Sequence, residues 1–430
     1  MNNQETAQYV VAGLLGAGAA KAQCKIVQSA KHELNVARGE ISLLRTTFDT
    51  AVDLLGLTDH QKGTVALNKT DPDSLGAAAR EAMNLARSAK PDPANDIAPY
   101  QPPREFENGP EQGDRDTMYH RLQEFLRYVR TTYPKTILEE INFDFTRTES
   151  VYANSNGVAW RANFGSYNFN IMFTSKDGPK TSSFNYAGCK FKDLDAPLEA
   201  IGGIDRLLAQ SAAHMDPGVI PHKFSGPVII APECLSDFIG YFTRYISDYA
   251  LITGNSVYKD KLHQKIAAAK LSLYAKPGAP EVAASYYFTG DGFLAQDGVI
   301  IENGVLNAFV LSLYAANKTG LPRTDHRGDC NVIAPGDTAL DDMIAATPRG
   351  ILLGRFSGGN PGDNGDFSGV AKNSFYIENG AIRHPLKETM ISGNIVAMLQ
   401  QIDQVSQERC NDGYRLLPWL KCNGITIAGK

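Results

Sequence analysis

The sequence has few cysteines and no closely spaced pair of them. Six cysteines are spread over 430 residues, and no two form a Cys-x-x-Cys pair. Small secreted domains use dense cysteine frameworks, and zinc ribbons or redox centres use paired cysteines. The pattern therefore predicts reduced thiols and a cytoplasmic location. The cysteines stand at positions 24, 189, 234, 330, 410 and 422.

Long apolar runs and an excess of positive charge are also missing. The apolar run Val10–Ala20 has eleven residues, whereas a membrane-spanning helix needs about 20. A signal peptide carries basic residues before such a run, but the charged side chain there is Glu5. The net charge of the chain is −5, which gives no electrostatic footprint for nucleic acid. We therefore expect a buried or amphipathic first helix, with neither membrane nor nucleic acid as a partner.

Several catalytic motifs are missing as well. No Gly-x-Ser-x-Gly nucleophile elbow surrounds Ser166 or Ser357. The glycine-rich stretch 358–369 lacks the Gly-Lys-Ser/Thr ending of a phosphate-binding loop and the ligand spacing of a calcium loop. Cys189 has no base near it in the sequence. These absences leave no catalytic residue to assign.

What is present indicates an α+β protein of more than one domain, because 430 residues exceed one ordinary core. We expect an N-terminal α/β-type unit over 1–90, a linker over 91–115, a β-rich middle section with flanking helices over 116–222 and a mostly β C-terminal domain over 223–430. Six prolines lie between Lys90 and Asp116, and they favour the linker. Helices are expected over 71–89, 116–133, 195–215, 235–253 and 339–346.

The tetrapeptide Ile-Glu-Asn-Gly occurs twice, at 301–304 and 377–380. Each copy lies between strand-like segments, and Asn-Gly is the strongest short signal for a hairpin turn. Before the second copy comes the loop 360–369, which is rich in glycine and in short polar side chains. Glycines let a second backbone come close, so we expect this loop to contact substrate. The candidate substrate-binding residues are Asp363, Asn364, Asp366, Phe367 and Ser368.

The order of several C-terminal motifs resembles the TldD/PmbA family. That family is metallopeptidase-related, and it has a zinc-bearing TldD branch and a metal-free TldE (PmbA) branch. The resemblance covers nearly the whole chain and is strongest after Gly226. The motifs are Asn364-Gly-Asp-Phe-Ser368, Ile377-Glu-Asn-Gly380, Pro385 with Lys387-Glu388, Ile391-Ser-Gly-Asn394 and Ile425-Thr-Ile-Ala-Gly429.

The resemblance also implies where a metal site would lie. The zinc-bearing branch carries His-Glu-x-x-x-His on the helix after the strand Gly226–Pro232. In this chain Gly240, Tyr241 and either Arg244 or Tyr245 take those positions. No histidine occurs between His222 and His263, so a shifted register does not restore the motif. The resemblance therefore implies no zinc in this chain and zinc in a partner.

A second cluster, Asp325–Cys330, places His326 and Cys330 four residues apart. Two ligand types do not make a metal site, and we expect a surface loop. The resemblance implies a non-catalytic subunit that pairs with a TldD-like zinc peptidase and helps to bind unfolded peptides or ribosomal peptide precursors. Two alternatives stay open: a stand-alone hydrolase with an unrecognised site, and a peptide-binding or regulatory module without peptidase linkage.

Overall fold

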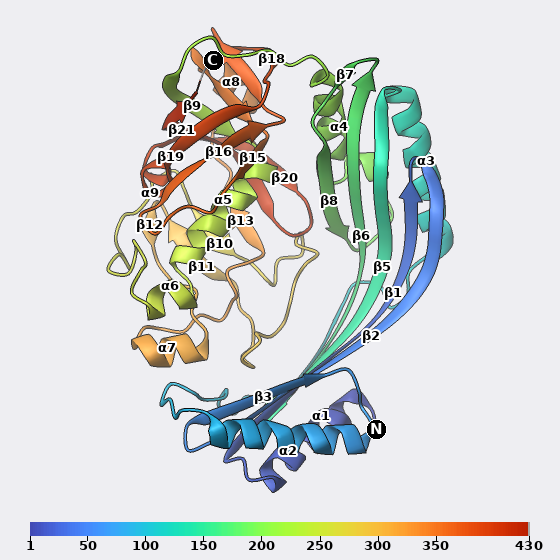
Figure 1. Ribbon diagram of the computed structural model, residues 1–430, viewed down its shortest axis with the longest axis vertical. Coiled ribbons are helices and arrows are strands. Elements are labelled where there is room, and N and C mark those ends of the chain that lie inside the picture. The colour runs from blue at the N-terminus through green and yellow to red at the C-terminus, as the bar shows by residue number, and fades with distance from the viewer. Residues whose placement is uncertain (429–430) are drawn as a thin grey trace.

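Two β-sheets organise the computed structural model, which describes residues 1–428 (Figure 1). The first sheet is long and curved and is built from the N-terminal half of the chain. The second forms the C-terminal domain, which lies beside the upper part of the first sheet. The predicted α+β class is confirmed. No helix among residues 1–428 is long and apolar enough to cross a membrane.

The first sheet is formed mainly by long antiparallel hairpins. Its strands are β1 Lys21–Ala37, β2 Glu40–Thr58, β3 Gln61–Leu67, β4 Arg104–Asn108, β5 Thr136–Asn154, β6 Ala159–Asp177, β7 Lys180–Thr181 and β8 Asn185–Phe191. The strand order is β3-β2-β1-β5-β6-β4, and β7 and β8 also pair with β6. Arg38 and Gly39 both have positive φ and turn β1 into β2. A turn at Asn156-Gly157, where Gly157 has positive φ, joins β5 to β6.

The helices of the N-terminal half are α1 Asn3–Gly16, α2 Pro72–Ser88, α3 Arg115–Thr132, the 3₁₀ turn η1 Leu198–Ala200 and α4 Ile204–Ala213. α2 begins as expected: Pro72 takes its first position, and the Asp71 side chain accepts a hydrogen bond from the Ser74 backbone N–H. The expected helix over 195–215 was too long, because Gly202 and Gly203 have positive φ and separate η1 from α4. α1 and α2 cover one end of the sheet, and α3 and α4 cover an apolar face.

The segment 91–115, which the prolines predicted as a linker, contains β4 and makes ordered contacts. β4 pairs in parallel with β6. Phe106 of β4 stacks on Tyr287 of the C-terminal domain, with ring centroids 4.4 Å apart. The Gln101 side chain donates a hydrogen bond to the Gly292 carbonyl oxygen at 2.8 Å. The segment therefore lies at the contact between the two halves of the molecule.

The second sheet is mixed and has β9 near its centre, parallel to β14 and antiparallel to β21. Its strands are β9 Phe224–Ile230, β10 Leu273–Ala275, β11 Gly298–Glu302, β12 Val305–Leu306, β13 Asn331–Ile333, β14 Arg349–Leu353, β15 Arg355–Gly358, β16 Asp366–Lys372, β17 Phe375–Glu378, β18 Ala381–Pro385, β19 Thr389–Asn394, β20 Ile402–Asn411 and β21 Leu416–Ile427. Both Ile-Glu-Asn-Gly copies form the predicted turns, since Asn303, Gly304, Asn379 and Gly380 all have positive φ.

The helices of the C-terminal domain are α5 Pro232–Tyr245, α6 Asp248–Ile252, α7 Leu313–Thr319, α8 Leu340–Ala345 and α9 Ile395–Gln400. The helix expected over 235–253 is thus two helices, because Ser247 has extended backbone angles between them. α5 buries Leu235, Phe238 and Phe242 in the main core of the domain. The start of α5, with Pro232, Glu233 and Ser236, lines a cavity whose other wall is the first sheet, and this places the candidate site.

Candidate functional site

The two faces of the first sheet differ in chemistry. One face is apolar and packs beneath α3 and α4. Side chains alternate along a strand, so the intervening residues point the other way. There Asn142 lies opposite Asn170, and Asp144 lies opposite Asn168. This polar face lines cavities whose other walls come from the C-terminal domain.

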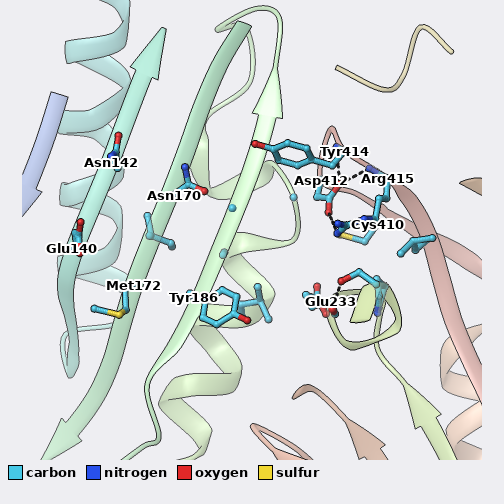
Figure 2. A pocket seen from close by; sticks show the side chains of 18 residues that line it. Glu140, Asn142, Asn170, Met172, Tyr186, Glu233, Cys410, Asp412, Tyr414 and Arg415 are labelled. Atoms are coloured by element: carbon cyan, nitrogen blue, oxygen red, sulfur yellow. Dashed lines mark hydrogen bonds and ion pairs between the residues drawn. The ribbon is translucent and has the colours of Figure 1, made fainter. Parts of the chain in front are cut away.

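A cavity of about 650 Å³ lies between the polar face and the C-terminal domain. Figure 2 shows its two walls: Glu140, Asn142, Asn170 and Tyr186 on the strands, and the start of α5 with the turn 412–415 on the other side. We call this space the interdomain cleft. Its lining combines apolar side chains with amide, carboxyl and phenol groups.

An ion pair borders the cleft. Arg206 of α4 is bound to Glu233 at the start of α5, and the Arg206 guanidinium lies 5.2 Å from the centroid of the Trp419 ring. Among the described residues, Glu233 Oε2 and Arg206 Nη1 are buried without a hydrogen-bond partner. A buried polar atom without a partner costs free energy, so this ion pair is incompletely satisfied beside the cleft.

The turn between β20 and β21 forms the neighbouring wall. The Asp412 carboxylate accepts hydrogen bonds from the backbone N–H groups of Tyr414 at 2.8 Å and Arg415 at 2.6 Å. Burial raises the pKa of Asp412 above its ordinary value. The Lys190 backbone N–H donates to the Asp412 carbonyl oxygen at 2.9 Å. The turn is therefore fixed against β8, and the two walls of the cleft are tied together.

The thiol in the cleft is not activated for nucleophilic attack. Cys410 is the thiol that lines it. Burial raises the pKa of Cys410 to about 12, so the thiol is protonated at neutral pH and is a poor nucleophile. Of the described residues, no histidine lines the cleft to act as its base.

A second cavity, of about 440 Å³, lies beside α5, and we call it the α5 cavity. It shares Ser236 and Arg415 with the interdomain cleft, so the two spaces are neighbours. Gly240, Tyr241 and Arg244 line it from the helix. A Cβ built on Gly240 would meet no atom within 4 Å, which shows that the cavity is open at this position.

These positions are the ones where the zinc motif was expected, and they do not fit zinc. Glycine has no ligand atom, and a guanidinium cation repels a metal ion. The Tyr245 hydroxyl donates a hydrogen bond to the Gly362 carbonyl oxygen. Within residues 1–428, no three His, Cys, Asp or Glu side chains lie close enough to hold a metal ion together.

The structure spreads the five predicted substrate-binding residues over different environments. Asp363 lines the α5 cavity. Asn364, Asp366 and Ser368 are exposed, and Asp366 accepts hydrogen bonds from the side chains of Asn364 and Asn394. Phe367 is only 4% exposed and packs in the core against Phe238. Its side chain therefore supports the loop from beneath.

In the loop Asp325–Cys330, Arg327 and Asp329 are exposed, whereas the side chains of His326 and Cys330 point inward. Both side chains are buried. Burial lowers the pKa of His326 and raises the pKa of Cys330 to about 12. His326 Nδ1 accepts a hydrogen bond from the Gly328 backbone N–H. These contacts account for both residues as parts of the fold.

Sequence reasoning missed the polar face and the arginines. The signal for the face was present, because Asn142, Asp144 and Thr146 alternate with apolar residues along one strand. Arg327 and Arg415 both line the α5 cavity. Because 87 residues separate them in the sequence, only the fold brings them together.

Comparison with known proteins adds an independent finding. Residues 224–429 match the family described as PmbA/TldA metallopeptidase C-terminal domain. The chain is 24% identical over 409 residues to the metalloprotease PmbA of Escherichia coli O157:H7, which covers 90% of this chain and 88% of that protein. It is 26% identical over 204 residues to a zinc metalloprotease TldD homolog of Saccharolobus solfataricus, covering 44% and 46%. The fold matches the crystal structure of TldE from Thermococcus kodakarensis with a TM-score of 0.85 and 20% identity, over 98% and 99% of the two chains.

Proposed function

Because the chain belongs to the PmbA/TldD family, we propose that it is a non-catalytic, cytoplasmic subunit of the TldE type that assembles with a TldD-like zinc peptidase. One observation carries the proposal. α5 and its open cavity are present, but Gly240, Tyr241 and Arg244 occupy the positions expected for the metal motif. A subunit that supports a neighbouring active site keeps this framework without the ligands.

The substrate that we propose is an extended peptide, from an unfolded protein or a ribosomal peptide precursor. The interdomain cleft offers amide and carboxyl groups that match the hydrogen-bonding groups of a peptide backbone. The peptide would also contact the loop beside the α5 cavity, through Asp363, Asn364, Asp366 and Ser368. The partner would supply the zinc-bound water and the glutamate base, and this chain would supply walls of the groove.

Co-expression with a zinc-bearing relative from the same genome tests the assembly. We expect the two chains to co-elute in size-exclusion chromatography, and we expect cleavage of unstructured peptides to need both. A partner that cleaves alone at the full rate, or two chains that never co-elute, would overturn the proposal.

The same preparation separates the alternatives. The purified chain alone, with and without added zinc, is assayed on the same peptides. Cleavage by the single chain would support a stand-alone hydrolase. Peptide binding without any effect on the partner's activity would support a binding module without peptidase linkage.

A further inference from the structure

We propose that the α5 cavity binds a peptide carboxylate between the guanidinium groups of Arg244 and Arg415. The inference rests on the proposed function, because it takes a peptide as the ligand. It goes further in assigning this chain a binding site of its own, at the place where a metal was expected.

The charges around the α5 cavity are unbalanced. Arg244, Arg327 and Arg415 line it together with Asp329 and Asp363, in a chain whose net charge is −5. Arg327 is already engaged: its Nη2 lies 3.0 Å from Asp329 Oδ2, and its guanidinium lies 3.7 Å from the centroid of the Tyr286 ring. The remaining charges that line the cavity are the two arginines Arg244 and Arg415 and the one carboxylate of Asp363, which leaves one positive charge in excess in the lining.

Both of these arginines have donors to spare. Within residues 1–428, the Arg244 side chain forms neither an ion pair nor a hydrogen bond. It is exposed and lines the cavity. Arg415 Nη1 lies 3.7 Å from Asp412 Oδ2, which is an ion pair beyond hydrogen-bonding distance, and the two backbone N–H groups that bind this carboxylate both donate to Oδ1. A guanidinium presents five N–H donors in a planar fork.

A carboxylate is the ligand that suits this arrangement. Arginine binds carboxylates through two parallel N–H···O bonds, which fixes orientation as well as charge. Gly240 leaves the floor of the cavity open. Asp363 also lines this cavity, and its negative charge would oppose the binding of a carboxylate. Because Ser236 and Arg415 also line the interdomain cleft, a peptide lying in the cleft reaches the cavity with one carboxylate.

Fluorescence anisotropy with labelled peptides tests the site on the full chain. Three labelled peptides are compared: one with a free C-terminal carboxylate, the neutral C-terminal amide of the same sequence, and that amide with one internal residue replaced by glutamate. We expect the free acid or the glutamate peptide to bind about tenfold more tightly than the neutral amide. The arm that gains affinity identifies the source of the carboxylate.

The substitutions Arg244→Gln and Arg415→Gln should reduce this preference to less than about twofold, and Asp363→Asn should increase it. Arg80→Gln, at an exposed arginine of α2 away from both cavities, is the matched control and should leave it unchanged. Equal binding of acid and amide, or a preference that survives both glutamine substitutions, would overturn the site. No binding up to about 1 mM peptide would overturn it too. Co-elution with the partner tests the subunit proposal separately, because it measures assembly and not the binding of a peptide.

Discussion

Gly365 shows how one residue shapes the loop that faces the α5 cavity. Its φ is +89°, a conformation that side chains with a Cβ rarely adopt. Its N–H donates to the Gly362 carbonyl oxygen and its own carbonyl accepts from Ile395, both at 2.8 Å. An added Cβ would lie 3.3 Å from side-chain atoms of Asn394, Ile395 and Val396. The backbone conformation therefore favours glycine, and the tight space around it adds to that preference.

Replacing Gly365 with Val should lower the free energy of unfolding by about 1–3 kcal/mol, because a β-branched residue is strained at positive φ. Replacing Ser368 with Ala should change it by less than about 0.5 kcal/mol, since Ser368 is exposed on β16. Thermal unfolding of both variants measures the difference. Equal midpoints would show that the loop tolerates strain and does not order the domain.

The metal positions give a second prediction at this scale. The chain purified without an affinity tag should hold much less than one zinc per chain, because Gly240 and Arg244 supply no ligand on α5. Elemental analysis of the dialysed protein measures this. One tightly held zinc that is lost on substitution of His326 or Cys330 would contradict the prediction and assign a site to the buried cluster.

At the scale of elements, the β20–β21 hairpin is held against the first sheet by its turn. Gly413 has a φ of +79°, and a Cβ there would lie 1.7 Å from the Lys190 carbonyl oxygen of β8. That distance is impossible without movement of backbone. Gly320, at the C-terminal end of α7, also has positive φ, but its Cβ would meet nothing within 4 Å. A comparison of the two positions therefore distinguishes the cost of backbone strain, which both share, from the cost of a steric clash, which only Gly413 has.

Gly413→Ala should therefore destabilise the protein by about 1–3 kcal/mol more than Gly320→Ala, because only the first adds a steric clash to the strain. It should also weaken peptide binding, since Asp412 and Arg415 belong to the same turn. Chemical denaturation and the anisotropy assay measure the two effects. Equal destabilisation by both substitutions would mean that the hairpin moves freely away from β8.

The elements that could be predicted from the sequence are those with a local cause. Asp71 and Pro72 start α2 through capping, and Asn-Gly pairs turn both Ile-Glu-Asn-Gly hairpins, whatever the rest of the chain does. β4 was missed because its partner β6 follows about 50 residues later, and prolines around it concealed five extended residues. The break between α5 and α6 at Ser247 was missed because apolar residues continue through it.

The candidate site was less predictable than the elements for the same reason. The position of α5 followed from the family resemblance, and Asp363 does line the α5 cavity. The interdomain cleft joins side chains from β5, β6, α5 and the 412–415 turn, which are far apart in the sequence. Phe367 was taken for a contact residue because alternation along β16 does not tell which face a neighbouring helix covers.

At the scale of the whole molecule, the segment 91–115 and its neighbours join the two halves. The Asp92 carboxylate accepts hydrogen bonds from Tyr314 and Lys318 of α7, each at 2.9 Å. The Asn317 side chain donates to the Ala94 carbonyl oxygen at 3.1 Å. These contacts lie at the opposite end of the C-terminal domain from α8 (Figure 1). They tie the two halves together, and we expect this junction to contribute to the width of the interdomain cleft.

Asp92 makes this junction dependent on pH. The hydrogen bond from Lys318 is the largest cause that lowers the pKa of Asp92 from 3.8 to about 2. A carboxyl whose pKa is lower in the folded state stabilises that state above its unfolded pKa, and this contribution is lost as the pH falls through the folded value. The junction should therefore be at full strength above about pH 4 and should weaken toward pH 2.

Asp92→Asn should consequently lower the unfolding midpoint in denaturant at about pH 7, and the gap to the unsubstituted chain should shrink at about pH 2.5. Asp49→Asn removes an equal charge from an exposed position on β2 and should leave little gap at either pH. If the Asp92→Asn gap were the same at both values, the carboxylate charge would not be what holds α7. Because we expect the junction to contribute to the width of the cleft, peptide affinity should fall together with the midpoint at neutral pH. An unchanged affinity would show that the cleft keeps its width through the β20–β21 turn alone.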